Sequence, residues 1–114
     1  ASDVYKRQGI EIVEKVLGNR SAYEKTVYLL KYYRYLKQGK RINEKYRSVL
    51  SLMDETIKMI EDDECFGVIE GLYIDGLTYE EVAEKLKMDK RTVYRQRRRL
   101  IRRISVILYG DRAL

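Results

Sequence analysis

Residues 78–100 read Thr-Tyr-Glu-Glu-Val-Ala-Glu-Lys-Leu-Lys-Met-Asp-Lys-Arg-Thr-Val-Tyr-Arg-Gln-Arg-Arg-Arg-Leu. The stretch holds two helical patterns with only residues 87–89 between them, and two helices joined so tightly must cross at a steep angle. Thr78 followed by Glu81 has the spacing of a capping box, which marks the start of the first helix. Ala83 is small enough to let the two backbones approach where they cross. This spacing predicts a helix-turn-helix.

The second helix of the pair, which runs from Lys90 to about Tyr109, has two faces of opposite chemistry. At roughly 100° per residue, three apolar side chains fall within about 40° of Val93 and predict the face that packs inward: Leu100, Ile104 and Ile107. Four arginines fall near the opposite direction: Arg91, Arg95, Arg98 and Arg102. Arginine forks match phosphate oxygens and the O6/N7 edge of guanine in the major groove. We therefore predict that this helix recognises double-stranded DNA.

Early positions of a recognition helix reach bases, whereas later positions more often reach the DNA backbone. We expect base or near-base contacts from Arg91, Thr92, Tyr94, Arg95 and Arg98. We expect phosphate contacts from Thr78, Tyr79, Lys90, Arg99 and Arg102. Neutralising about four phosphates would give a log–log salt slope near about −3.6. Arg97 lies on the inward side, so we expect it to pair with Glu80, Glu81 or Glu84, or to extend back to solvent.

The positive charge of the 114-residue chain is confined to this same end. Residues 1–89 hold 15 Lys+Arg and 17 Asp+Glu, a net of −2, whereas residues 90–114 hold 9 Lys+Arg and 1 Asp, a net of +8. Such asymmetry indicates an end that binds a polyanion. The alternative is a solvated basic helix without a partner.

The composition also excludes several kinds of chemistry. The chain has no histidine and one cysteine, Cys65, which excludes a disulfide framework and the usual zinc and histidine-based catalytic sites. It contains no glycine loop suited to cradle phosphate and no nucleophile–base set. We therefore expect no enzymatic activity, no metal and no cofactor. No apolar run approaches the length of a membrane span, and we expect a cytoplasmic protein without membrane contact.

Outside the helix-turn-helix the pattern is helical throughout, and we predict an all-α fold. The absence of proline and the presence of only 7 glycines argue against a turn-rich β fold. A first short helix ends near Gly18, and a second begins at Ser21, with Glu24 at the capping-box offset, and ends near Lys37. A third helix carries an apolar stripe: Ile42, Tyr46, Val49, Leu50, Met53, Ile57 and Ile60.

Three segments follow from these patterns. Residues 1–8 resemble a translated adapter scar, and we expect them to be non-native or disordered. Residues 9–61 form the N-terminal helical region, and residues 62–114 form the DNA-binding domain. We expect Asp62, Asp63 and Glu64 to form the first turn of this domain's leading helix, where acids complement the helix dipole.

Residues 62–110 resemble the sigma-factor region-four type of helix-turn-helix, on the stretch from Gly76 to Leu86. Residues 89–95, with the terminal Leu108-Tyr109-Gly110, look like the C-terminal signature of ArpU/RinA-type phage transcriptional regulators. The resemblance implies a phage or prophage regulator that binds promoter-region DNA and activates late or packaging-related genes. Lys87 departs from the pattern, which often has glycine there. A complete sigma factor is not expected on length.

Several alternatives stay open at this point. The chain could be the DNA-recognition component of phage packaging machinery, or a basic module that docks on an acidic protein such as RNA polymerase. It could also act as a homodimer, because paired half-sites multiply affinity. The tyrosines of the second helix could stack on single-stranded bases or serve a core or protein interface: Tyr28, Tyr32, Tyr33 and Tyr35.

Overall fold

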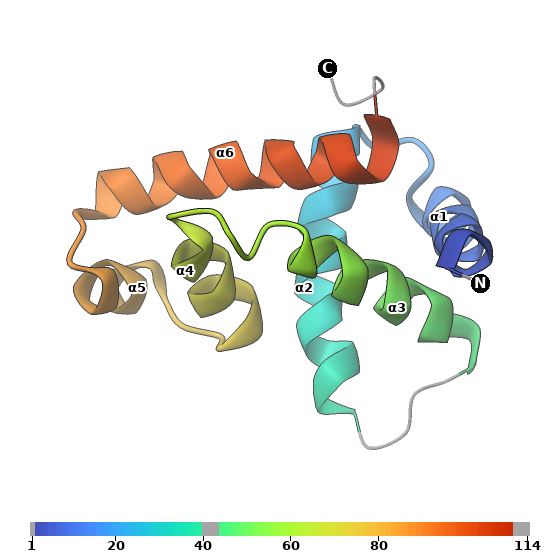
Figure 1. Cartoon of the computed structure of the whole chain (residues 1–114), viewed down its shortest axis with the longest axis horizontal. Helices are drawn as coiled ribbons and strands as arrows, with labels where there is room; N and C mark the ends of the chain where they lie inside the picture. Colours follow the sequence, from blue (N-terminus) through green and yellow to red (C-terminus); the bar gives the residue numbers. More distant parts are fainter. Residues whose placement is uncertain (1, 40–43, 111–114) are drawn as a thin grey trace.

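The computed structural model describes residues 2–39 and 44–110, and for residues 2–6 and Lys45 it describes the backbone alone. All regular structure in these residues is helical, which confirms the all-α prediction (Figure 1). The elements are α1 (Ser2–Leu17), α2 (Ala22–Gln38), α3 (Glu44–Lys58), α4 (Phe66–Ile69), the π-helical turn η1 (Glu70–Ile74), α5 (Tyr79–Leu86) and α6 (Lys90–Tyr109).

Three helices begin at the side-chain caps that the sequence predicts. The Ser21 hydroxyl accepts from the Glu24 N–H (3.1 Å) at the start of α2. At α5, Thr78 and Glu81 form a complete capping box, with reciprocal bonds of 3.1 and 3.0 Å. Asp89 starts α6 by accepting from the N–H of Thr92, the third residue of the helix (2.6 Å). Each cap supplies an acceptor for a backbone N–H that the helix itself leaves free.

The first helix begins earlier than the sequence predicts. Helix α1 starts at Ser2 instead of near Ile10, so residues 2–8, which the sequence prediction leaves outside the fold, are helical. Gly9 explains why this turn can lie against α3: a Cβ there would come within 3.1 Å of the Ser48 carbonyl oxygen. The close approach leaves Gly9 buried between α1 and α3.

The acidic triplet 62–64 lies in turns before α4, and the prediction that it opens a helix is wrong. Helix α4 begins at Phe66 and has no acid in its first turn. The Asp63 carboxylate accepts from the Cys65 N–H (2.9 Å) and otherwise faces α6, where two arginines bind it. Ile42, at the head of the predicted apolar stripe, and residues 111–114 lie outside the described residues.

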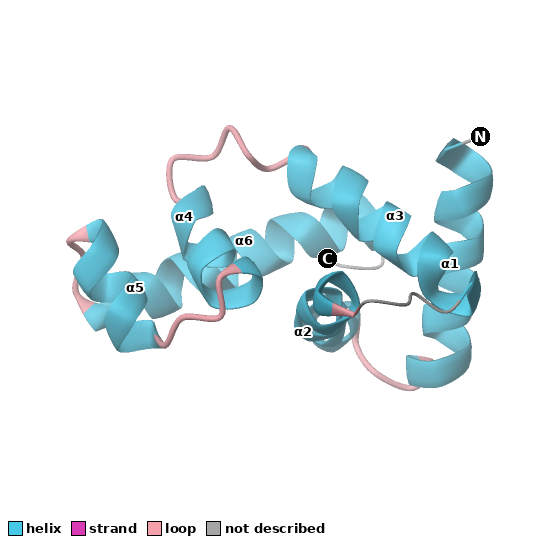
Figure 2. Ribbon diagram, turned by 90° about the horizontal axis from the view of Figure 1, so that it is seen from below, coloured by secondary structure: helices cyan, strands magenta, loops and turns pink. Residues whose placement is uncertain are grey.

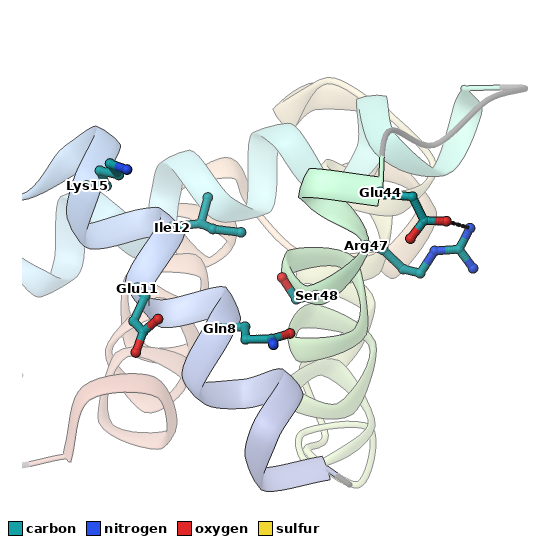
Figure 3. Close-up of a pocket in the computed structure, with 7 residues that line it drawn as sticks. All are labelled: Gln8, Glu11, Ile12, Lys15, Glu44, Arg47 and Ser48. Carbon is teal, nitrogen blue, oxygen red and sulfur yellow. Dashed lines mark ion pairs between the residues drawn. The ribbon is translucent and has the colours of Figure 1, made fainter.

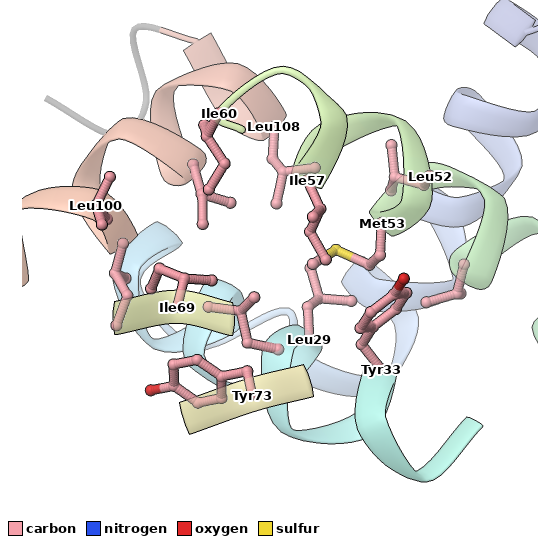
Figure 4. Close-up of a cluster of buried hydrophobic side chains, with 14 of the residues drawn as sticks. Leu29, Tyr33, Leu52, Met53, Ile57, Ile60, Ile69, Tyr73, Leu100 and Leu108 are labelled. Atoms are coloured by element: carbon pink, nitrogen blue, oxygen red, sulfur yellow. The ribbon is translucent and has the colours of Figure 1, made fainter. Parts of the chain in front are cut away.

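Two hydrophobic clusters meet on α6. The small cluster consists of Val68, Val82 and Val93, one from each helix of the helix-turn-helix region, all fully buried. The larger one joins Leu100 and Leu108 of α6 to side chains of α2, α3, α4 and η1 (Figure 4). The first half of α6 therefore packs on α4 and α5, and its second half packs on α2 and α3 (Figure 1).

The larger cluster crosses the segment boundary drawn near Glu61. It holds Leu29, Met53 and Ile57 from before that point together with α6 side chains from after it. A buried hydroxyl pair adds to this contact, because Thr26 of α2 and Ser105 of α6 lie 2.8 Å apart. The front helices and α6 consequently share one core, and α6 joins it to the small cluster of the helix-turn-helix.

Turn η1 approaches α5 closely at Gly71, and α5 ends in a tight turn at Lys87. A Cβ at Gly71 would lie 2.8 Å from a methyl of Val82, so only glycine fits without a shift of the neighbouring side chain. Lys87 ends α5 in the left-handed region, with φ 55° and ψ 43°.

Among the described helices, none is long and apolar enough to cross a membrane.

Candidate nucleic-acid interface

The outward face of α6 carries the predicted row of arginines. Their side chains are all exposed, and within the described part of the chain no ion pair engages them: Arg91, Arg95, Arg98 and Arg102. On the opposite face Val93, Leu100 and Ile104 are fully buried. The helix therefore separates a fixed apolar side from a charged side that is available to a polyanion.

Two tyrosines join the starts of α5 and α6. The rings of Tyr79 and Tyr94 stack with their centroids 4.2 Å apart and their planes at 21°. Tyr94 stays 43% exposed, so its side chain remains partly accessible next to the arginine row. Thr78 is exposed, but its hydroxyl already caps α5, and half-buried Thr92 gives its N–H to the α6 cap. These residues stabilise the starts of α5 and α6, and they also lie beside the recognition helix.

Lys90 has a partner within the chain. Its ammonium forms an ion pair with Glu80 at the start of α5. Hydrogen bonding between the two groups raises the pKa of Lys90 and lowers the pKa of Glu80. A phosphate would have to compete with the Glu80 carboxylate for this ammonium, so Lys90 is less available than the arginine row.

Arg99 is also engaged within the chain. Its two terminal nitrogens donate to the two carboxylate oxygens of Asp63 at 2.9 and 2.7 Å, and its Nε donates to Gln96 (2.7 Å). Arg103 adds a third bond to the same carboxylate (3.1 Å) and a longer one to Asp62 (3.5 Å). The hydrogen bonds from Arg99 hold the pKa of Asp63 well below its ordinary value. The sequence pattern gives no signal that Asp63 binds Arg99 and Arg103, because these contacts join residues 36 and 40 positions apart.

Arg97 has a structural partner, but the partner is a tyrosine and the prediction of a carboxylate is wrong. Its Nε donates to the Tyr73 hydroxyl at 2.7 Å, and its guanidinium lies 5.9 Å from the centre of that ring. Burial raises the pKa of Tyr73, so the hydroxyl stays neutral. The π-helical turn η1 places Tyr73 beneath α6, and a regular helical pattern gives no signal of that placement.

The tyrosines of α2 divide between core and surface. Tyr33 is buried and donates to Asp54 of α3 at 2.6 Å. Tyr32 and Tyr35 are 54% and 69% exposed, and Tyr28 stacks on Tyr32 with centroids 6.3 Å apart. Tyr33 therefore stabilises the fold, and the other rings remain on or near the surface.

A separate hollow lies between α1 and α3, on the other half of the molecule (Figure 3). Its volume is ≈ 470 Å³, and both charge signs line it, including the Arg47–Glu44 ion pair of 2.9 Å. None of the predicted DNA-contacting residues borders this hollow. The candidate interface is thus the outward face of α6 together with the start of α5.

The fold and this face define a helix-turn-helix protein with a basic recognition helix. Comparison with known families gives the class its name: the family described as ECF sigma factor matches residues 7–106. The chain belongs to the ECF sigma factor family, and it is a sigma-factor-like, DNA-binding regulator. The match begins well before residue 62, so the likeness includes the front helices as well as the helix-turn-helix. No curated protein and no solved structure matches the chain.

Proposed function

We propose that this protein regulates transcription by reading the major groove of promoter DNA with α6, in contact with RNA polymerase. The row of four exposed arginines opposite a fully buried apolar face is the observation that carries the proposal. Two hydrophobic clusters hold α6, so its side chains meet DNA from a fixed frame. Membership of the ECF sigma factor family supports both partners, DNA and RNA polymerase.

Within this function we assign different tasks along α6. Arg91, Arg95 and Arg98 contact bases or their immediate surroundings, with Tyr94 beside them. Arg102, farther along the helix, contacts phosphate, as later positions usually do. Lys90 and Arg99 mainly hold α6 in position, because they already form ion pairs with Glu80 and Asp63.

We further propose a phage or prophage origin and a non-enzymatic role. The resemblance of residues 89–95 and of the terminal Leu108-Tyr109-Gly110 to the ArpU/RinA-type regulators supports the origin. A homodimer on paired half-sites remains part of the proposal, because such pairing would raise the affinity of a small domain for its operator. A DNA-recognition role in packaging would use the same face and would differ in leaving transcription unchanged.

The test begins with selection of bound sites from a random duplex pool. Wild type, Arg95→Ala and the control Arg47→Ala are then titrated against the selected duplex and a random duplex. Arg95→Ala is expected to lose about 1–3 kcal/mol of discrimination, while Arg47→Ala, which changes an exposed arginine of α3, retains it. An equal, small loss on both duplexes would indicate a nonspecific basic face and would overturn base readout by Arg95. A dependence of promoter transcription on the protein separates regulation from packaging.

A further inference from the structure

A cleft of ≈ 570 Å³ with charged side chains in its lining opens between α2 and the start of α5. Lys31, Arg34 and Tyr35 line its α2 side, Tyr79 and Glu80 line its α5 side, and Arg97 of α6 also lines it. The lining thus holds three cations and one carboxylate. Its positive charge lies outside the arginine row of α6, and the major-groove contacts proposed above do not use it.

The cations of α2 are available, whereas the carboxylate is not. Lys31 is exposed and makes no ion pair with any residue that the structure describes; its ammonium lies 5.9 Å from the Tyr28 ring. The Arg34 guanidinium packs on Gly76, where an added Cβ would lie 2.3 Å from its Cζ, and its buried Nε has no hydrogen-bond partner among the described residues. Glu80 is paired with Lys90.

The capping box reduces the number of backbone donors that the start of α5 can offer to an anion. The Thr78–Glu81 capping box already occupies the N–H groups of both of those residues. An anion in this cleft would meet the side chains of α2, and Lys31 offers it an exposed ammonium that forms no ion pair with any described residue.

The two flanks of α6 differ in charge in a way that selects this side. The turn that joins α3 to α4, with Asp62, Asp63 and Glu64, lies along one flank, and α2 with the loop that leads into α5 lies along the other (Figure 2). Arg99 and Arg103 offset most of the acidic charge on the first flank, so a DNA backbone would gain little there, whereas the cations of the second flank would attract it. Tyr79 links the cleft to the recognition helix, because it lines the cleft and stacks on Tyr94.

We propose that this cleft binds a phosphate of the DNA backbone, with Lys31 and Arg34 of α2 extending the contact surface of the helix-turn-helix onto the front half of the chain. The inference rests on the proposed function, since it needs the duplex to lie along α6. The contact carries no base information, so it strengthens binding to specific and random sequences alike.

The salt dependence of DNA binding tests this contact. Affinity for a random-sequence duplex is measured between about 0.05 and 0.2 M salt for wild type, Lys31→Ala and Lys15→Ala. Lys15 is a matched control, because it is an exposed lysine on α1, away from the cleft. Lys31→Ala is expected to make the log–log slope shallower by about 0.9 and to weaken binding about eightfold at 0.1 M salt, and the control is expected to keep the wild-type slope.

The remaining outcomes separate this inference from the function on which it rests. If Arg95→Ala weakens specific binding but Lys31→Ala keeps the wild-type slope, the phosphate site is wrong and the recognition helix stands. If wild type binds no duplex, both proposals fail. An equal change in slope for Lys31→Ala and Lys15→Ala would show a general charge effect and would also overturn the site. Arg34→Gln, checked for folding by circular dichroism, is expected to make the log–log salt slope shallower, as Lys31→Ala does.

Discussion

Asp63 and Arg99 lie 36 positions apart and meet through two parallel hydrogen bonds of 2.9 and 2.7 Å. The Asp63 side chain is only 10% exposed, whereas the Arg99 side chain is 47% exposed. With the additional bond from Arg103, the carboxylate fastens the turn after α3 to the middle of α6. A residue of the turn before α4 thereby orients the helix that we assign to DNA.

Replacing Asp63 by Asn is expected to destabilise the fold by about 1–2 kcal/mol, which chemical denaturation measures. A hydrogen bond to a charged group is worth roughly this amount, and the half-exposed arginine keeps the cost below that of a fully buried pair. Asp62→Asn serves as the control, because Asp62 makes a single 3.5 Å contact and is largely exposed. Equal effects of the two substitutions would contradict the central role of Asp63.

The same pair predicts how stability depends on pH. Arg99 depresses the pKa of Asp63 in the folded state, so the ionised carboxylate stabilises the fold above the pKa of the unfolded chain, about 4. This contribution is lost as the pH falls from about 4 toward the lower pKa of the folded state. The stability difference between wild type and Asp63→Asn should therefore be constant from neutral pH to about 5 and shrink below about 4. A difference that grows on acidification would contradict this assignment.

Lys87→Gly is expected to stabilise the protein by up to about 1 kcal/mol. Lys87 has a φ of 55°, a left-handed conformation that costs a residue with a side chain about 1–2 kcal/mol, and glycine loses part of the gain through its freedom in the unfolded chain. The measurement is the thermal midpoint. Lys85→Gly is the control: it lies within α5 and should destabilise instead.

Thr26 and Ser105 predict a small coupling between α2 and α6. Their hydroxyls lie 2.8 Å apart, and each also lies 2.8 Å from the carbonyl oxygen four residues before it. Either hydroxyl can therefore donate to its own helix when the other is removed, so Thr26→Val or Ser105→Ala should each cost only about 1 kcal/mol. A double-mutant cycle should return a coupling of about 0.5–1 kcal/mol, and a coupling near zero would remove the hydroxyl pair as a link.

The features that the sequence predicts correctly are local ones. The caps at Ser21, Thr78 and Asp89 depend on neighbours three residues away, and the two faces of α6 depend on helical geometry alone. Asp63 and Arg97 could not be assigned, because their partners come from distant segments and from a π-helical turn that shifts Tyr73 out of the regular register. The contacts with DNA stay predictions.

The 20 residues of α6 make a rod of roughly 30 Å with no flexible joint between its two anchored ends. Any protein that binds α2 or α3 therefore determines the angle at which the arginine row approaches a duplex. The orientation of the arginine row on the promoter would then be set by contacts at the opposite end of the molecule.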